Sequence, residues 1–236
     1  MPVLNEFEFE ISLADLRQLR TLHSKKGLNS GIRALLPEVL AEVEERALLR
    51  PAIAWESRRV LEVSGSRVRL AGGSELAQAE AVVELLGDAE ELVMVVGSIG
   101  PALDLLSRDW FANGRELEAF VLSEVGNLAV GKLNDCIPQS IADWAVGRGL
   151  ETSGALSPGG TGIDLSEQRV VVELASAERI GVELTSTCML TPLKSISMVI
   201  GLGHGLPKWS HAQACELCAS RDRCRLRRVD SETAVA

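Results

Sequence analysis

One histidine and three of the five cysteines of this 236-residue chain fall within a short stretch near its C-terminus. His211, Cys215, Cys218 and Cys224 follow the spacing H-x3-C-x2-C-x5-C. A C-x2-C turn brings two thiolates to one centre, and a short loop can add a third. A neutral imidazole upstream completes four ligands. The spacing therefore predicts a metal site.

This ligand set resembles the distal [4Fe–4S] site of iron-only hydrogenases and of the large peripheral subunit of respiratory complex I. One histidine and three cysteines ligate the cluster there, so the resemblance implies that His211, Cys215, Cys218 and Cys224 bind a [4Fe–4S] cluster. Zinc is the chemical alternative, because three cysteines and one histidine also form structural zinc sites. If His211 is an ordinary surface histidine, Cys188 or Cys136 is the alternative fourth ligand.

The charge of the chain is uneven. The formal net charge is −9, which argues against non-specific binding of nucleic acid through its phosphates. Five arginines nevertheless crowd the segment around Cys224: Arg221, Arg223, Arg225, Arg227 and Arg228. They form either a solvated face, a positive collar around an anionic cluster, or a docking patch for an acidic partner.

Cysteine usage and the N-terminus predict a cytoplasmic protein. The first residues lack the basic and apolar regions of a signal peptide. No apolar run approaches the roughly 20 residues of a membrane span. An odd number of cysteines, three of them in a ligand-like cluster, favours a reducing compartment over a disulfide framework. We therefore expect neither a membrane nor a nucleic acid as a partner.

Apolar periodicity predicts the elements that must position these residues. Predicted helices cover 12–25, 32–49, 74–86, about 100–113, 117–149 with a break near Pro138, and 164–177, where Asp164 and Glu167 form a capping box. Predicted strands cover 52–63, 67–70, 92–96, 180–184 and 196–200. Helices and strands alternate without a regular βαβ rhythm, which predicts an α+β fold with a mixed or antiparallel sheet and flanking helices.

The second half of the chain carries an ordered set of sequence blocks. They are Gly97-Ser-Ile-Gly100, Leu122-Ser-Glu-Val-Gly126, Gly154-Ala-Leu-Ser-Pro-Gly-Gly160, Asp164-Leu-Ser-Glu-Gln168, Ile180-Gly-Val-Glu-Leu-Thr185 and Met189-Leu-Thr-Pro-Leu-Lys-Ser195. In order and spacing, over roughly 92–203, they resemble the activation domain of cobalamin-dependent methionine synthase, and more closely its small free-standing relatives. The resemblance implies a C-shaped α+β domain with a twisted antiparallel sheet. It also implies S-adenosylmethionine binding and docking over a corrinoid-carrying domain during reductive methylation of cob(II)alamin.

The ligand motif of that family is altered in this chain. Its R-x-x-x-G-Y motif has Ala155 at the arginine position and Gly160 at the tyrosine position, and the chain has no tyrosine. Without the guanidinium that would grip the ligand carboxylate, the sequence predicts that S-adenosylmethionine is not bound in the family's manner. Ser157, Pro158 and Gly159 remain as a remnant ligand loop.

Residues 1–203 are therefore predicted to form an activation-domain-like body, and 204–236 a C-terminal metal-binding arm with a tail. The leading hypothesis is a redox accessory that docks on a corrinoid-binding methyltransferase component and supports reductive activation of cob(II)alamin. A redox donor protein would reduce its [4Fe–4S] cluster, and corrinoid would be met only through the partner. One alternative is a non-catalytic docking module with a structural zinc, and another is an S-adenosylmethionine-dependent activase that uses substitute binding residues. The sequence shows no acid–base catalytic set.

Overall fold

The fold comes from a computed structural model, which describes residues 2–5, 7, 10–18, 23–24, 27–28, 30–160, 162–209, 213 and 222. The N-terminal part contains β1 (Val3–Leu4), α1 (Leu13–Gln18), β2 (His23–Ser24), β3 (Gly27–Leu28) and α2 (Ser30–Glu45). The next part contains four strands of the sheet and one helix: β4 (Ala52–Ser64), β5 (Arg67–Leu70), β6 (Glu75–Leu76), α3 (Glu80–Leu86) and β7 (Glu91–Ser98). The rest comprises α4 (Ala102–Ala112), α5 (Glu116–Val146), β8 (Glu151–Leu156), η2 (Leu165–Glu167), α6 (Gln168–Ala175), η3 (Ala177–Ile180), β9 (Glu183–Leu184), β10 (Leu190–Thr191) and β11 (Ser195–Gly203).

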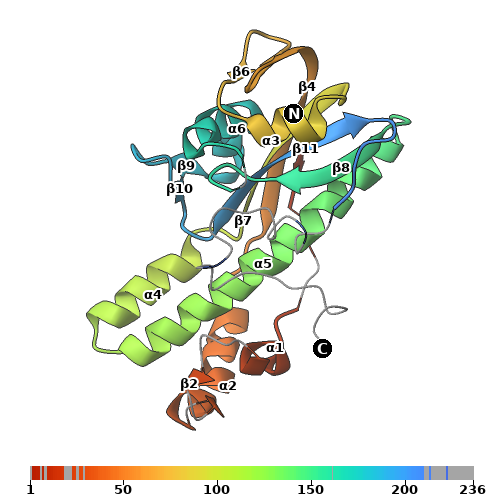
Figure 1. Cartoon of the computed structure of the whole chain (residues 1–236). Helices are drawn as coiled ribbons and strands as arrows, with labels where there is room; N and C mark the ends of the chain where they lie inside the picture. Colours follow the sequence, from red (N-terminus) through yellow and green to blue (C-terminus); the bar gives the residue numbers. More distant parts are fainter. Residues whose placement is uncertain are drawn as a thin grey trace.

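One sheet organises the molecule, with the strand order β6-β5-β4-β7-β11-β8 and β1 paired to β4 (Figure 1). Every strand pairing among the described residues is antiparallel. β7 lies at the centre, paired along its whole length with β11 and with the first part of β4. The predicted α+β class with a sheet flanked by helices is confirmed, and its sheet is antiparallel.

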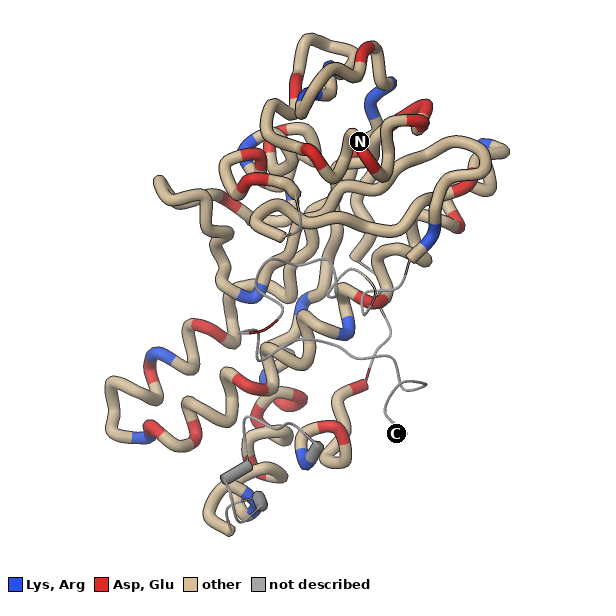
Figure 2. The backbone as a smooth tube through the Cα atoms, in the orientation of Figure 1, with Lys and Arg blue, Asp and Glu red and all other residues tan. Residues whose placement is uncertain are grey.

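The alternation of side chains along β7 divides the core into two layers. Val93 and Val95 face the layer of α1, α2, α4 and α5, whereas Leu92, Met94 and Val96 face the layer of α3 and α6. Because both faces are covered, β7 reads as a continuous apolar run. Accordingly, β11 carries no charged residue and β7 carries only Glu91, at its first position (Figure 2).

Helix α5 runs through Pro138 without ending, so the predicted break there is wrong. Proline removes one backbone hydrogen bond from a helix interior. The helix continues because Leu133, Ile137, Ile141 and Ala145, each four residues apart, are fully buried on one side of it. Its first half pairs with α4 in a helical hairpin, and its second half crosses the sheet (Figure 1).

None of the helices in the described ranges has the length and apolar character needed to cross a bilayer.

Other predicted boundaries shift where tertiary contacts override local pattern. Helix α3 begins at Glu80 and not at Ser74, because Glu75 and Leu76 pair with β5. The predicted helix 12–25 is wrong at 23–24, which pair with β3. The capping box at 164–167 is also wrong: Asp164 accepts a hydrogen bond from Ser166 N, but the buried Glu167 carboxylate accepts from Ala77 N and Gln78 N.

The chain after β11 returns to the sheet at its outer edge strand, β8. Gly154 N donates to Pro207 O at 3.1 Å, and Trp209 Nε1 donates to Ala155 O at 3.1 Å. The indole of Trp209 lies directly on Gly154, so a Cβ there would come within 2.3 Å of the ring. The boundary between body and arm at residue 203 stays a prediction, but residues 207–209 are joined to β8.

An ion pair near the end of α5 predicts a pH dependence of stability. Arg148 donates two hydrogen bonds to Glu91, at 2.6 and 2.9 Å, and its guanidinium lies over the Trp144 ring at 5.0 Å. These hydrogen bonds lower the pKa of Glu91 below 4.5, so its stabilisation is present above that value and is lost as the pH falls through the lowered pKa. We expect Glu91→Gln to lower the free energy of unfolding at pH 7 by about 1 kcal/mol or less. The difference from the wild-type chain should vanish in acid, as urea unfolding at several pH values would measure.

Candidate functional site

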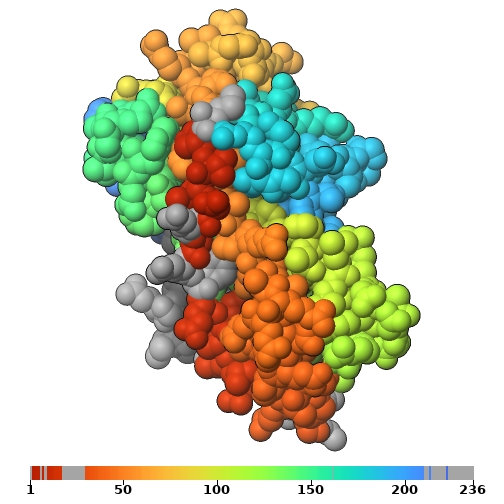
Figure 3. Space-filling model, turned by 180° about the vertical axis from the view of Figure 1, so that it is seen from behind, coloured from red at the N-terminus to blue at the C-terminus, as the bar shows by residue number. Residues whose placement is uncertain are grey.

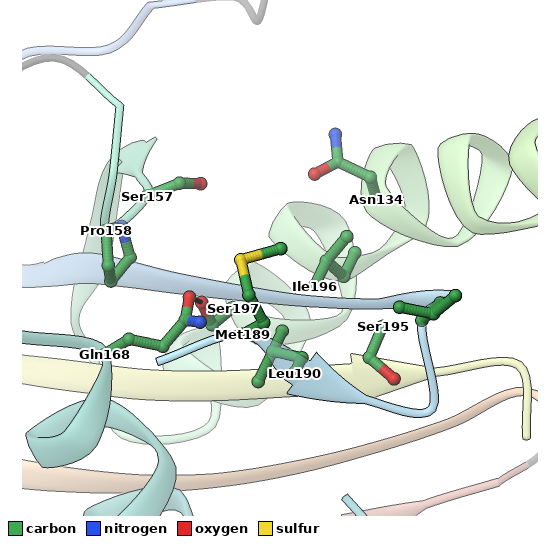
Figure 4. Close-up of a pocket in the computed structure, with 10 residues that line it drawn as sticks. Asn134, Ser157, Pro158, Gln168, Met189, Leu190, Ser195, Ile196 and Ser197 are labelled. Carbon is green, nitrogen blue, oxygen red and sulfur yellow. Dashed lines mark hydrogen bonds between the residues drawn. The ribbon is translucent and has the colours of Figure 1, made fainter. Parts of the chain in front are cut away.

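A pocket of about 260 Å³ lies where β8 ends and β11 continues (Figure 4). Four segments line it: α5, the loop after β8, the start of α6, and the stretch from β10 into β11. The lining residues are Asn134, Ser157, Pro158, Gln168, Met189, Leu190, Leu193, Ser195, Ile196 and Ser197. All of these are uncharged, with polar side chains interspersed among apolar ones.

The floor of this pocket is an open edge of β11. β8 pairs with β11 only as far as Leu156, opposite Val199, so 195–198 have β7 on one side and no described strand on the other. On the β7 side of β11, Ile99 N donates to Lys194 O. On the opposite side, Gly201 N donates to Ser153 Oγ. By the alternation of an antiparallel ladder, the backbone N–H and C=O groups of Ser195 and Ser197 therefore point to the open side.

The loop after β8 forms one wall of the pocket. Gly160 N donates to Ser157 O, closing a turn, and Gly159 adopts a φ of +76° that favours glycine. Gly159 N donates to Ile163 O, which fixes the turn against the following segment. Of the remnant ligand loop, Ser157 and Pro158 line the pocket, whereas Gly159 shapes the turn. A ligand-binding role for the three stays a prediction.

A second part of the pocket lining is held by Gln168, the first residue of α6, which is almost completely buried. Its Oε1 accepts from Ser197 Oγ at 2.7 Å, and its Nε2 donates to Cys188 O in the turn between β9 and β10. Cys188 itself has a φ of +61°, and Met189 beside it is half exposed at the pocket mouth. One buried amide therefore fixes both the strand floor and the turn that carries Met189.

Three further contacts hold the segment that carries Leu193, on the rim. Asp104 accepts a hydrogen bond from Leu193 N at 3.0 Å. The buried Lys194 ammonium crosses α5 and donates to Asn127 Oδ1 at 2.8 Å and to Ser123 Oγ at 3.1 Å. Gly126 makes this crossing possible, because a Cβ there would lie 2.9 Å from Lys194 Cε. The rim is thus fixed to both helices of the hairpin.

The predicted metal ligands His211, Cys215, Cys218 and Cys224 lie outside the described residues, so their site stays a prediction. In the part of the chain that the structure describes, no group of three or more histidine, cysteine or acidic side chains could hold a metal ion. The two alternative fourth ligands are described: Cys188 is buried in the β9–β10 turn, and Cys136 is partly buried on α5.

Sequence reasoning did not single out most of the pocket. Asn134, Ile196 and Ser197 fall only within predicted helices or strands, and Gln168 and Met189 to Ser195 only within sequence blocks. The one available signal was the order of those blocks, because the loop after β8, the start of α6 and the start of β11 all fall within or beside them.

The described residues form an α+β domain that is built on an antiparallel sheet with a long crossing helix. Comparison with known proteins supports this class of fold. A search of solved structures matches the chain to "Crystal Structure of the MetH Reactivation Domain bound to AdoHcy", with a TM-score of 0.56 and 13% sequence identity. The match covers 94% of this chain and 86% of that one. No family model and no curated protein sequence matches the chain. At 13% identity the likeness shows a shared fold.

Proposed function

We propose that this protein is a redox accessory that docks on a corrinoid-binding methyltransferase component and supports reductive activation of cob(II)alamin. The observation that carries the proposal is the likeness of fold to a MetH reactivation domain over 94% of the chain. The same chain carries the His211, Cys215, Cys218 and Cys224 motif near its C-terminus. A docking fold and a set of cluster ligands in one chain are what such an accessory requires.

The donor set fits a [4Fe–4S] cluster. Three thiolates leave a 2+ cluster with a net charge of −1, and a neutral imidazole adds none. Replacing a thiolate by imidazole raises the reduction potential, and the arginines from Arg221 to Arg228 act in the same direction. When bound, such a cluster supplies one electron at a time. The contacts of Pro207 and Trp209 with β8 hold the chain that precedes the motif against the edge of the sheet.

Two projections on the same side of the molecule offer a docking surface (Figures 1 and 3). One is the α4–α5 hairpin, where Phe111 is 65% exposed and Leu105 is 58% exposed. The other is the β9–β10 region with its following loop, where Leu193 is 63% exposed. Large apolar side chains exposed together are typical of protein interaction sites. A corrinoid protein that contacts both projections would cover the rim of the pocket.

The alternatives differ in what the arm and the pocket bind. A docking module with a structural zinc would use the same four ligands only to hold its arm. An S-adenosylmethionine-dependent activase would need substitute residues, because Ala155 replaces the family's arginine and the described residues that line the pocket are uncharged. The uncharged lining disfavours a zwitterionic ligand, since burying unpaired charges costs several kcal/mol or more.

Trapping the reduced corrinoid tests this proposal. The protein would be reduced with dithionite, desalted without oxygen, and mixed with cob(II)alamin and iodomethane. One electron converts cob(II)alamin to cob(I)alamin, which displaces iodide to give methylcobalamin and draws an unfavourable electron transfer forward. We expect methylcobalamin in proportion to reduced protein. Iron-loaded, reduced protein that yields none would contradict the proposed electron transfer.

A further inference from the structure

The pocket at the open edge of β11 combines two properties that restrict its ligand. Its described lining holds no charged side chain, and its floor presents backbone N–H and C=O groups from Ser195 and Ser197. Alternate residues of a strand lie about 6.5–7 Å apart, so each serine offers its own donor and acceptor pair. A ligand that satisfies such a pair must itself carry an adjacent acceptor and donor.

A primary carboxamide has that arrangement, because its C=O accepts where the strand donates and its NH2 donates where the strand accepts. A carboxylate offers acceptors only and would bring a charge into a site whose described lining holds no cation to pair with it. An ammonium group offers donors only. The chemistry of the pocket therefore selects a neutral amide over either end of an amino acid.

We infer that this pocket binds a peripheral carboxamide of the partner's corrinoid, an inference that rests on the proposed function. The edge of a corrin ring carries several acetamide and propionamide arms, each a flexible chain that ends in a primary carboxamide. Such an arm reaches Ser195 and Ser197 from outside, as the next β-strand would. Ser157 and Asn134, on opposite walls, add polar groups beside the same floor (Figure 4).

The size of the pocket sets how much of the ligand enters. Sites that enclose a whole drug-sized molecule measure about 300–1,000 Å³. At about 260 Å³ this pocket admits a substituent and leaves a macrocycle outside. Met189 and Leu193, 51% and 63% exposed at the mouth, then provide an apolar rim for the ring edge. The open edge from 195 to 198 offers an extended peptide only a short pairing.

Two corrinoids that differ in these groups test the inference on the full-length protein. Dicyanocobinamide carries carboxamide arms, whereas dicyanocobyrinic acid carries carboxylates in their place, and titration followed by visible absorbance would give both affinities. We expect cobinamide to bind at least about tenfold more tightly, the equivalent of one well-made buried hydrogen bond. Equal binding of the two would overturn the inference, as would tighter binding of S-adenosylmethionine. Competition by a glutamine-containing peptide as effective as cobinamide would assign the amide to a protein side chain instead, and would also overturn it.

A matched pair of tryptophan variants locates the binding. Met189→Trp places a large ring at the mouth, and we expect it to weaken cobinamide binding about tenfold or more. Leu61→Trp adds the same ring at a 57% exposed position on the distant part of β4, and should leave binding unchanged. Equal effects of the two variants would contradict the assignment. Methylcobalamin formation distinguishes failure of this inference from failure of the proposed function. If the protein still supports methylcobalamin formation but binds cobinamide and cobyrinic acid equally, the inference fails and the proposed function stands.

Discussion

Cys218→Ser is expected to remove the iron from this protein while leaving its body folded. Cys218 contributes one of the three thiolates of the predicted cluster and belongs to the C-x2-C pair that brings two of them together. The two apolar core clusters, by contrast, are built from residues between Ile11 and Leu206, with Trp209 only packed against the second. Iron analysis should therefore fall to near zero. The thermal midpoint should stay within a few degrees of wild type.

The cysteines of the body provide the control. Cys136→Ser on α5 and Cys188→Ser in the β9–β10 turn should keep their iron if His211 is the fourth ligand. Loss of iron in one of them, with retention in His211→Ala, would assign the fourth ligand to that cysteine. Global unfolding of Cys218→Ser would point instead to a structural metal on which the fold depends.

Gly154→Ala is expected to release the start of the arm from β8. The new Cβ would lie 2.3 Å from the Trp209 ring, so the ring must move away from Gly154. Its hydrogen bond to Ala155 O is then lost. Overpacking of this kind costs about 1–3 kcal/mol. Urea unfolding would measure that loss, and a red shift of tryptophan fluorescence would report the greater exposure of the indole.

Two comparisons isolate the Gly154–Trp209 contact. Gly147→Ala adds the same methyl group at the end of α5, where the nearest atom is 3.5 Å away and φ is −62°, and should be nearly neutral. In a Trp209→Ala background, Gly154→Ala should cost much less than in the wild-type chain, because the clashing ring is gone. Equal costs in the two backgrounds would show that the contact does not hold the arm.

The sequence predicted the central fold because its strongest patterns coincide with tertiary burial. The apolar run 92–96 and the strands 52–63 and 67–70 all appear in the sheet, as β7, β4 and β5. It failed where a distant partner decides the local structure. Glu75 and Leu76 are a strand only because β5 lies beside them, and α5 passes Pro138 only because its buried face holds it to the sheet.

The candidate site was less predictable than the fold, for a similar reason. Its floor is the part of β11 that β8 does not pair with, because β8 ends at Leu156 and β11 extends beyond it to Ser195. The local sequence of β11 does not show where the neighbouring strand ends. Gly154 begins one of the sequence blocks. A glycine is needed there because the Trp209 ring, more than fifty residues away in the sequence, packs directly on it. The metal-ligand motif from His211 to Cys224 could be predicted because its residues are close in sequence. It lies outside the described residues and stays a prediction.

The most direct test of the account is the metal content of anaerobically purified protein, measured as iron, acid-labile sulfide and zinc. The account predicts about four iron and four sulfide per chain, with an electron paramagnetic resonance signal of a reduced cluster after dithionite. One zinc per chain without sulfide would contradict it, and would leave a docking module whose metal only holds the arm.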